Sequence, residues 1–167
     1  MLLLERESPS DQELCTFLAR STFRMLGVSS VTLAELGPGG MVRVVASEGL
    51  RSDEAKRLAS IDVPLSADIP VVEAIRDNRL VWLNDMVAMG QSHPDAAGIA
   101  AQLPVGTIIS WPIQRPGGLA GSLSIYSPDI LFPNPTTEAF LRTVGNLMAL
   151  FANLASPAPQ VANDRES

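Results

Sequence analysis

The sequence is poor in the residues that most often build covalent or metal sites. It has a single cysteine, Cys15, and a single histidine, His93. One cysteine cannot close an intrachain disulfide or build a thiolate metal cage, and this usage is typical of a reducing, intracellular compartment. No nucleophile elbow, phosphate loop or His-Glu-x-x-His motif is present. We therefore expect a cytoplasmic protein with no catalytic set, no metal and no cofactor.

Positive charge is also scarce. The chain has 12 Lys and Arg against 18 Asp and Glu, a formal net charge of -6. Such a field repels phosphate backbones and anionic lipid headgroups, so we expect no direct contact with nucleic acid and none with a membrane. The start of the chain lacks the basic and apolar regions of a secretory signal. An uncharged run over residues 96–114 is interrupted by Pro104, Gly106 and Pro112, which excludes a membrane span.

Apolar residues, in contrast, are abundant. They make up 46% of the 167 residues, enough for one buried core in a chain of this length. We expect one domain over residues 10–155, preceded by a short lead (1–9). The polar, proline-rich tail (156–167) is typical of disorder or a linker.

Local signals divide the domain into helices and strands. Ser10 and Glu13 form a capping box before a helix that ends at Gly27, and Asn134 caps the last helix. Pro94 lies in the stretch that is hardest to interpret, residues 86–105, which we predict to be a loop with one irregular helix near 94–103. The remaining predicted elements are strands at 30–36, 41–48, 79–85, 107–114 and 119–127, an extended piece at 61–65, and helices at 52–59 and from Asp68 onward.

This order of elements predicts an α+β fold. Short glycine-rich turns join neighbouring strands into hairpins near both ends of the strand series, so the sheet should be mostly antiparallel, with five or six strands. The helices at the two chain ends are then free to pack together on one face of the sheet.

Three segments in this order resemble parts of a GAF domain. Residues 68–85 (DIPVVEAIRDNRLVWLND) resemble its helix, turn and strand. Residues 109–113 (ISWPI) and 121–126 (GSLSIY) resemble its closing hairpin, and residues 133–154 resemble its terminal helix. The resemblance implies a six-stranded antiparallel sheet with the first and last helices on one face and a ligand pocket, covered by helices and loops, on the other.

The resemblance also implies a role. GAF domains are mostly regulatory modules that bind a small molecule or a protein, signal to an output domain and often dimerise through their terminal helices. The free methionine sulfoxide reductases of the family need several cysteines, its bilin-binding members attach the chromophore through a pocket cysteine, and its haem-binding members use a histidine. The signature of the cyclic-nucleotide-binding members has no counterpart here.

We therefore expect a non-enzymatic, ligand-binding sensor, the input domain of a bacterial transcriptional or signalling regulator. The alternative is a protein-interaction or dimerisation module with no small-molecule ligand. That alternative predicts a pocket filled by Trp82, Trp111 and the methionines.

The candidate ligand-binding residues lie in or beside the strands that border the pocket of a GAF-like fold. A wide ring with an N–H donor suits a flat ligand, small hydroxyl residues on a buried strand leave space for one, and loops carry function. Each also has a structural explanation: the tryptophans as core, the serines as room for a helix over the sheet, the acidic residue as a turn former and the methionine as a gap filler. The candidates are Trp82, Asp85, Met89, Ser110, Trp111 and Ser124.

Three further residues are assigned structural roles. Asp68 is interpreted as the N-cap of its helix rather than a ligand contact, and Cys15 as a core residue. His93, next to a proline in the least regular stretch, is interpreted as a surface histidine.

The last helix carries an apolar seam at alternating spacings of four and three residues, typical of helix pairing. Gly145 on this helix permits close approach, so we expect a homodimer in which the seam meets the first helix, its symmetry mate or both. The predicted interface residues are Phe140, Val144, Leu147, Phe151 and Leu154.

Overall fold

The computed structural model describes residues 11–100, 105–114 and 120–155, and the predicted lead and tail lie outside this range. The described chain forms one antiparallel sheet of six strands in the order β3-β2-β1-β6-β5-β4. The predicted α+β fold is therefore confirmed. The elements are α1 (Asp11–Leu26), β1 (Ser30–Leu36), the 3-10 turn η1 (Pro38–Gly40), β2 (Met41–Glu48), α2 (Ser52–Ala59), β3 (Asp62–Pro64), α3 (Pro70–Asp77), β4 (Val81–Leu83), α4 (Met86–Ser92), α5 (Pro94–Ala100), β5 (Thr107–Gln114), β6 (Ala120–Ser127) and α6 (Pro135–Ala155).

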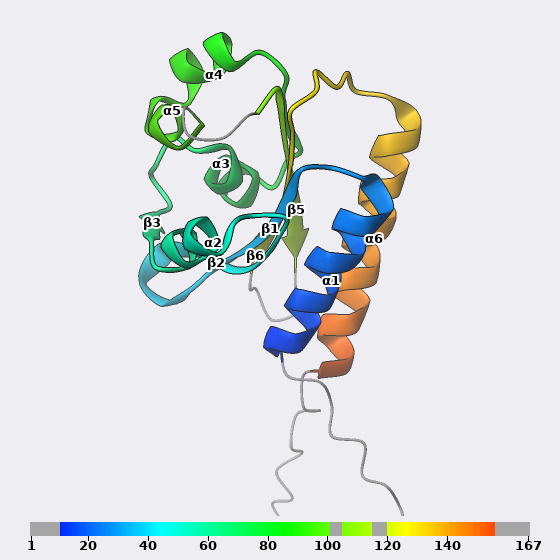
Figure 1. Cartoon of the computed structure of the whole chain (residues 1–167). Helices are drawn as coiled ribbons and strands as arrows, with labels where there is room; N and C mark the ends of the chain where they lie inside the picture. Colours follow the sequence, from blue (N-terminus) through cyan, green and yellow to red (C-terminus); the bar gives the residue numbers. More distant parts are fainter. Residues whose placement is uncertain (1–10, 101–104, 115–119, 156–167) are drawn as a thin grey trace, which may run out of the picture.

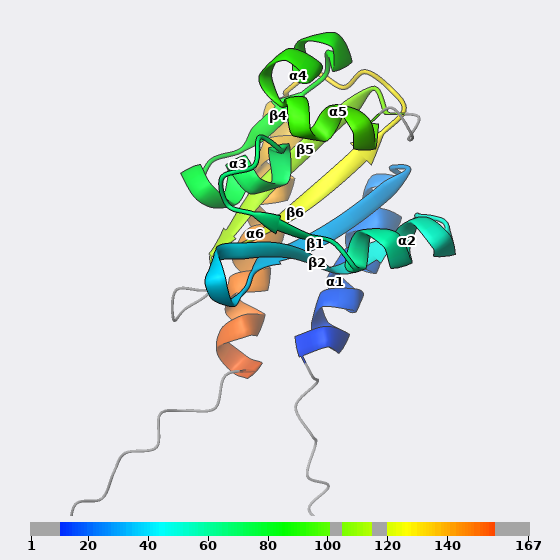
Figure 2. The ribbon, with the colours of Figure 1, turned by 90° about the vertical axis from the view of Figure 1, so that its left-hand side faces the viewer.

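Helices cover both faces of the sheet. Helices α1 and α6 lie side by side on one face, and α2, α3, α4 and α5 lie toward the other (Figures 1 and 2). Helices α1 and α6 run in opposite directions, so the start of α1 and the end of α6 lie at the same end of the molecule (Figure 1). We call the side that carries α1 and α6 the helix face and the opposite side the pocket face.

Alternation along each strand divides its side chains between two cores. On β1, Val31 and Leu33 belong to the core under α1 and α6, whereas Ala34 belongs to the second core, which includes Val72 and Ile75 of α3. The register shifts between Leu33 and Ala34, where β1 carries an irregularity opposite β2. The sheet thus separates two apolar layers.

The β1–β2 hairpin turns through two glycines with positive φ, Gly39 at 76° and Gly40 at 72°. Glycine reaches this region without the steric cost of a Cβ.

At the edge of the sheet, the Arg43 guanidinium donates to both carboxylate oxygens of Asp62 at 2.6 and 2.8 Å, which links β2 to β3.

Two sequence-based predictions in the middle of the chain need correction. Residues 86–105 contain two helices, α4 and α5, rather than one irregular helix; Asp85 caps α4 and Pro94 begins α5. Helix α3 begins at Pro70 with Ile69 as its N-cap, so Asp68 lies outside the helix and does not cap it.

The last helix begins as predicted. The Asn134 side chain accepts a hydrogen bond from the backbone N–H of Thr137 at 2.9 Å. Farther along, α6 approaches the sheet at Gly145, where a Cβ would lie 2.6 Å from Nε1 of Trp111. The close approach that Gly145 permits is therefore made within the chain, between α6 and β5. No helix in the described ranges has the length and apolarity needed to cross a membrane.

Candidate functional site

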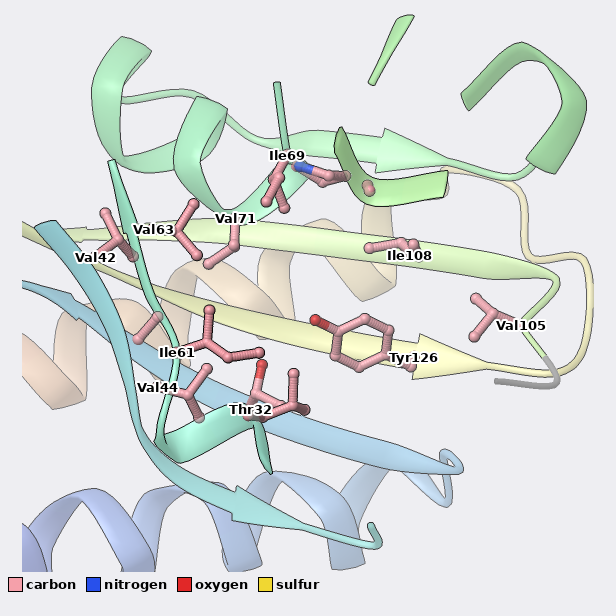
Figure 3. A pocket seen from close by; sticks show the side chains of 14 residues that line it. Thr32, Val42, Val44, Ile61, Val63, Ile69, Val71, Val105, Ile108 and Tyr126 are labelled. Atoms are coloured by element: carbon pink, nitrogen blue, oxygen red, sulfur yellow. The ribbon is translucent and has the colours of Figure 1, made fainter. Parts of the chain in front are cut away.

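A cavity of about 80 Å³ lies on the pocket face of the sheet. Strands β1, β2, β5 and β6 form its floor, and residues of α2, α3 and α5 and of the segment around β3 form its walls. Figure 3 shows labelled side chains of β1, β2, β5, β6 and α3 and of the segment around β3 pointing toward a common space. The predicted arrangement, with a pocket on one face and the terminal helices on the other, is present.

The cavity wall is almost entirely aliphatic. Of the 14 described residues that line it, only Thr32 and Tyr126 have polar side chains, and none carries a charge. The valine-rich β1–β2 hairpin supplies Val42 and Val44, and β5 supplies Ile108. Such a wall favours apolar surface and offers few hydrogen bonds.

A row of buried hydroxyls crosses the sheet beside this cavity. Ser124 of β6 is paired with Ser110 on β5 and with Thr32 on β1, and the Ser110 and Ser124 hydroxyls are 2.8 Å apart. The Tyr126 hydroxyl is hydrogen-bonded to the side chains of Thr32 and Ser124. Figure 3 shows this hydroxyl directed into the cavity on the side of Thr32. We call Ser110, Ser124, Tyr126 and Thr32 the hydroxyl row.

Burial governs the ionisation of Tyr126. Desolvation raises the pKa of its phenol, and hydrogen bonding with the side chains of Thr32 and Ser124 only partly opposes this effect. The phenol therefore stays neutral over the ordinary pH range and is available as both donor and acceptor.

None of the six residues predicted to bind a ligand lines the cavity. Ser110 and Ser124 are on the correct face and belong to the hydroxyl row, but they are fully buried in the part of the sheet against which α3 packs. Asp85 accepts hydrogen bonds from the backbone N–H groups of Val87 and Ala88 as the cap of α4, and Met89 is buried in the same helix.

The two tryptophans lie against the core of the helix face. The Trp82 indole N–H donates to the backbone carbonyl of Leu131 at 2.9 Å, which ties β4 to the segment before α6. Trp111 contacts Gly145. Because neither ring enters the cavity, the filled pocket predicted by the interaction-module alternative is not observed.

His93 is buried, with 5% of its surface exposed, which corrects the prediction of a surface histidine. Its Nε2 atom is hydrogen-bonded to the carboxylate of Glu73 on α3, and its Nδ1 atom lies 2.8 Å from the Ser92 hydroxyl. Arg79 donates to the other carboxylate oxygen of Glu73. This cluster of Glu73, Arg79, Ser92 and His93 joins α3 to the end of α4.

The same cluster has the order of a serine–histidine–carboxylate triad but not its geometry. The Ser92 hydroxyl also lies 3.0 Å from the carbonyl of Ala88, one turn back in its own helix, and donates to it. Helix α5 is held by a nearby contact, in which the Asp95 carboxylate accepts a hydrogen bond from the backbone N–H of Asp68 at 2.9 Å. Since Ala96 of α5 lines the cavity, these contacts position one wall of the pocket. No group of three potential metal ligands occurs among the described residues.

The seam on α6 is divided between two environments. Phe140 and Val144 are half-buried against the core of the helix face, whereas Leu147 is 47% exposed. The side chains of Phe151 and Leu154 lie outside the described residues. The prediction that Cys15 is a core residue is confirmed.

Sequence reasoning missed the residues that line the cavity, Thr32 and Tyr126 among them. Tyr126 is the single tyrosine of the chain, and it shares a strand face with Ser122 and Ser124. A lone aromatic hydroxyl in a row of small polar residues was the available signal.

The described fold matches solved structures of GAF domains. A GAF domain/HD domain protein from Geobacter sulfurreducens superposes with a TM-score of 0.70 at 14% identity, over 86% of this chain and 92% of that one. The GAF domain of a phosphoenolpyruvate-protein phosphotransferase from Coxiella burnetii gives 0.69 at 16% identity, over 86% and 83%. A type II free methionine-R-sulfoxide reductase from Thermoplasma acidophilum gives 0.64 at 18% identity, over 86% and 92%.

No protein-family model matches the chain, and no curated protein matches it in sequence. The six-stranded sheet and its flanking helices nevertheless identify the architecture, and the resemblance predicted from the sequence is confirmed at the level of the fold. The chain has the fold of a GAF domain.

Proposed function

We propose that the chain is a non-enzymatic sensory module that binds a small molecule in the cavity and signals through α1 and α6, as the input domain of a bacterial transcriptional or signalling regulator. One observation supports this most: an apolar cavity on the pocket face, directly across the sheet from the two terminal helices. Because side chains alternate along a strand, a residue that faces the cavity is followed directly by a residue that packs under the terminal helices.

Two such connections run through the hydroxyl row. Thr32 lines the cavity, and its neighbours on β1, Val31 and Leu33, are in the core shared with α1. Ser110 belongs to the row, and the next residue, Trp111, contacts Gly145 of α6. A ligand that prefers one arrangement of these strands would shift the populations of the helix arrangements by its difference in affinity.

The position of Cys15 supports a non-enzymatic role. One structural neighbour is a free methionine sulfoxide reductase, and cysteine-based reduction of a sulfoxide needs a thiol that reaches the substrate and a second thiol that resolves it. Cys15 is the single cysteine and is buried in the helix-face core, across the sheet from the cavity.

The proposal includes a homodimer formed through the terminal helices. Phe17 and Met25 are eight residues apart on α1 and are 60% and 69% exposed. Leu147 on the adjacent α6 is also exposed. Large apolar side chains exposed on paired helices favour a partner helix.

The test is to fill the cavity. Val44 lines it and is only half-buried, so the larger ring of Val44→Trp should occupy the space. Val87→Trp, at an exposed position on α4, is the matched control. Thermal unfolding is measured across a metabolite panel, and native mass spectrometry records any molecule that copurifies.

We expect a compound that stabilises the unsubstituted chain and Val87→Trp but not Val44→Trp. Equal stabilisation of all three forms, or no stabilisation and no copurified molecule, would overturn the small-molecule proposal.

A further inference from the structure

The cavity offers no partner for a charged ligand. Its described wall has no ionisable side chain other than the Tyr126 phenol, which burial keeps neutral. A charge moved from water into such a wall loses its hydration and gains no ion pair in return. The wall therefore selects against carboxylates, phosphates and ammonium groups.

The hydroxyl row has one hydrogen-bond donor to spare. Each of its four hydroxyls carries one proton, and its three contacts, Ser110–Ser124, Ser124–Tyr126 and Tyr126–Thr32, use three of them. Within the described chain no further acceptor takes the fourth. Because Thr32 is the end of the row that lines the cavity, the contacts can be oriented so that this proton points at a ligand.

The size of the cavity suits a ligand, or the part of a ligand that enters it, of about one ring. A volume of about 80 Å³ corresponds to roughly five to eight water positions at about 10–15 Å³ each. A six-membered ring with one small substituent is of this order.

From these three observations we infer that the ligand is a neutral, mainly apolar molecule about one ring in size, with a single hydrogen-bond acceptor, such as a carbonyl oxygen, bound by the Thr32–Tyr126 end of the hydroxyl row. This inference rests on the proposed function, since it names the chemical class that the sensory site recognises.

Three probes of matched size separate charge from hydrogen bonding. Cyclohexanone presents a neutral acceptor, methylcyclohexane presents none, and cyclohexanecarboxylate carries a charge. Ligand-observed NMR titrations measure the affinity of each for the unsubstituted chain, Thr32→Val, Tyr126→Phe and Val44→Trp. Thr143→Val, at an exposed position on α6, is the control for the loss of a threonine hydroxyl.

We expect cyclohexanone to bind best and cyclohexanecarboxylate at least about 100-fold more weakly, a difference of about 2.7 kcal/mol. Thr32→Val should lower the affinity for cyclohexanone by about 2- to 12-fold, the range for one neutral hydrogen bond, and leave the affinity for methylcyclohexane unchanged. Tyr126→Phe should act in the same direction, Thr143→Val should change nothing, and Val44→Trp should abolish binding of every probe.

Three outcomes overturn the inference and leave the proposed function intact, and the first two concern the probes. One is a carboxylate that binds as tightly as the ketone and is blocked by Val44→Trp; the other is a ketone whose affinity survives both hydroxyl substitutions. The third is that no probe binds although a metabolite of the panel binds and its binding is lost in Val44→Trp; the inferred chemical class is then wrong, whereas the proposed binding site is correct. If nothing binds at all, the proposed function fails as well.

Discussion

The serines on the pocket face differ in whether their hydroxyls are bonded. Ser122 Oγ is buried and has no hydrogen-bond partner among the described residues, because its cross-strand neighbours are Ala34 and Pro112. Ser124, one pair along, has Ser110 opposite it. A buried hydroxyl without a hydrogen-bond partner costs free energy. Removing a hydroxyl that is hydrogen-bonded leaves its former partner buried and unpaired, which also costs free energy.

Ser122→Ala should therefore leave the free energy of unfolding unchanged or raise it, whereas Ser124→Ala should lower it by about 1–3 kcal/mol. Denaturant unfolding of the two variants, followed by circular dichroism, measures both values. A large loss at Ser122 with none at Ser124 would contradict the assignment of the hydroxyl row.

Tyr126 reports directly on the cavity because it is the only tyrosine in the sequence. Burial raises its pKa, so in the native protein the ultraviolet absorbance of tyrosinate should appear above the ordinary value of about 10. The stability gained from the neutral phenol is fully present below the unfolded pKa and is lost as the pH rises through the folded pKa.

The free energy of unfolding should thus fall in alkali above about pH 10, and Tyr126→Phe should lack this part of the fall. The denatured chain supplies the unshifted reference titration. A native titration that coincides with the denatured one would mean that the phenol is open to water.

Sequence alone could not assign strand faces to the two layers. Alternation correctly placed Trp111 with Ile109 and Ile113, yet the pattern does not say which set faces the terminal helices. The helix face holds both indole rings, and Gly145 leaves room there for that of Trp111. The pocket face holds small hydroxyl residues, valines and the ring of Tyr126. The two tryptophans predicted to contact a ligand therefore lie in the other layer.

At the scale of elements, the contact between α6 and β5 depends on Gly145. In a helix interior, alanine is normally more stable than glycine by about 1 kcal/mol. Here the added Cβ would lie 2.6 Å from the rigid indole of Trp111, so α6 or the ring must move. We expect Gly145→Ala to lower the free energy of unfolding by about 1–3 kcal/mol, the usual cost of overpacking.

Gly90 on α4 is the matched control because nothing lies within 4 Å of its added Cβ. Gly90→Ala should stabilise the protein slightly, and Trp111→Phe should relieve much of the cost of Gly145→Ala in the double variant. A Gly145→Ala variant as stable as Gly90→Ala would exclude the close contact.

Elements with strong local signals were predicted well, and those held by tertiary contacts were not. Strands β1 and β2 and helix α2 have the predicted bounds, since turns and caps define their ends. Helices α4 and α5 are short and rich in Ala, Gly and Met, with no clear periodicity. Their position depends on His93 reaching Glu73 and on Asp95 reaching the backbone of Asp68, contacts between residues 20 and 27 positions apart.

For the whole molecule, the order of elements predicted a mostly antiparallel sheet with both terminal helices free to pack on one face, and the GAF resemblance implied the pocket on the other face. In the structure β1 and β6 are neighbours in the middle of the sheet, and the two terminal helices share one face (Figure 2). The order of elements does not predict which residues of the α6 seam pack against the sheet and which lie on the outer surface. Phe140 and Val144 pack inward, and Leu147 remains exposed.

The proposed homodimer should therefore depend on the outward residues. Phe17→Glu on α1 and Leu147→Glu on α6 place a charge where a partner helix would bury an apolar side chain, and each should raise the dimer dissociation constant by at least about tenfold, or about 1.4 kcal/mol. Both side chains are exposed in the monomer, so folding should survive. Phe132→Glu, also at an exposed position but in the segment before α6, is the control. Sedimentation equilibrium of the three variants decides the question: a chain that is monomeric without any substitution, or a dimer that only Phe132→Glu disrupts, would exclude α1 and α6 as the interface through which the signal passes.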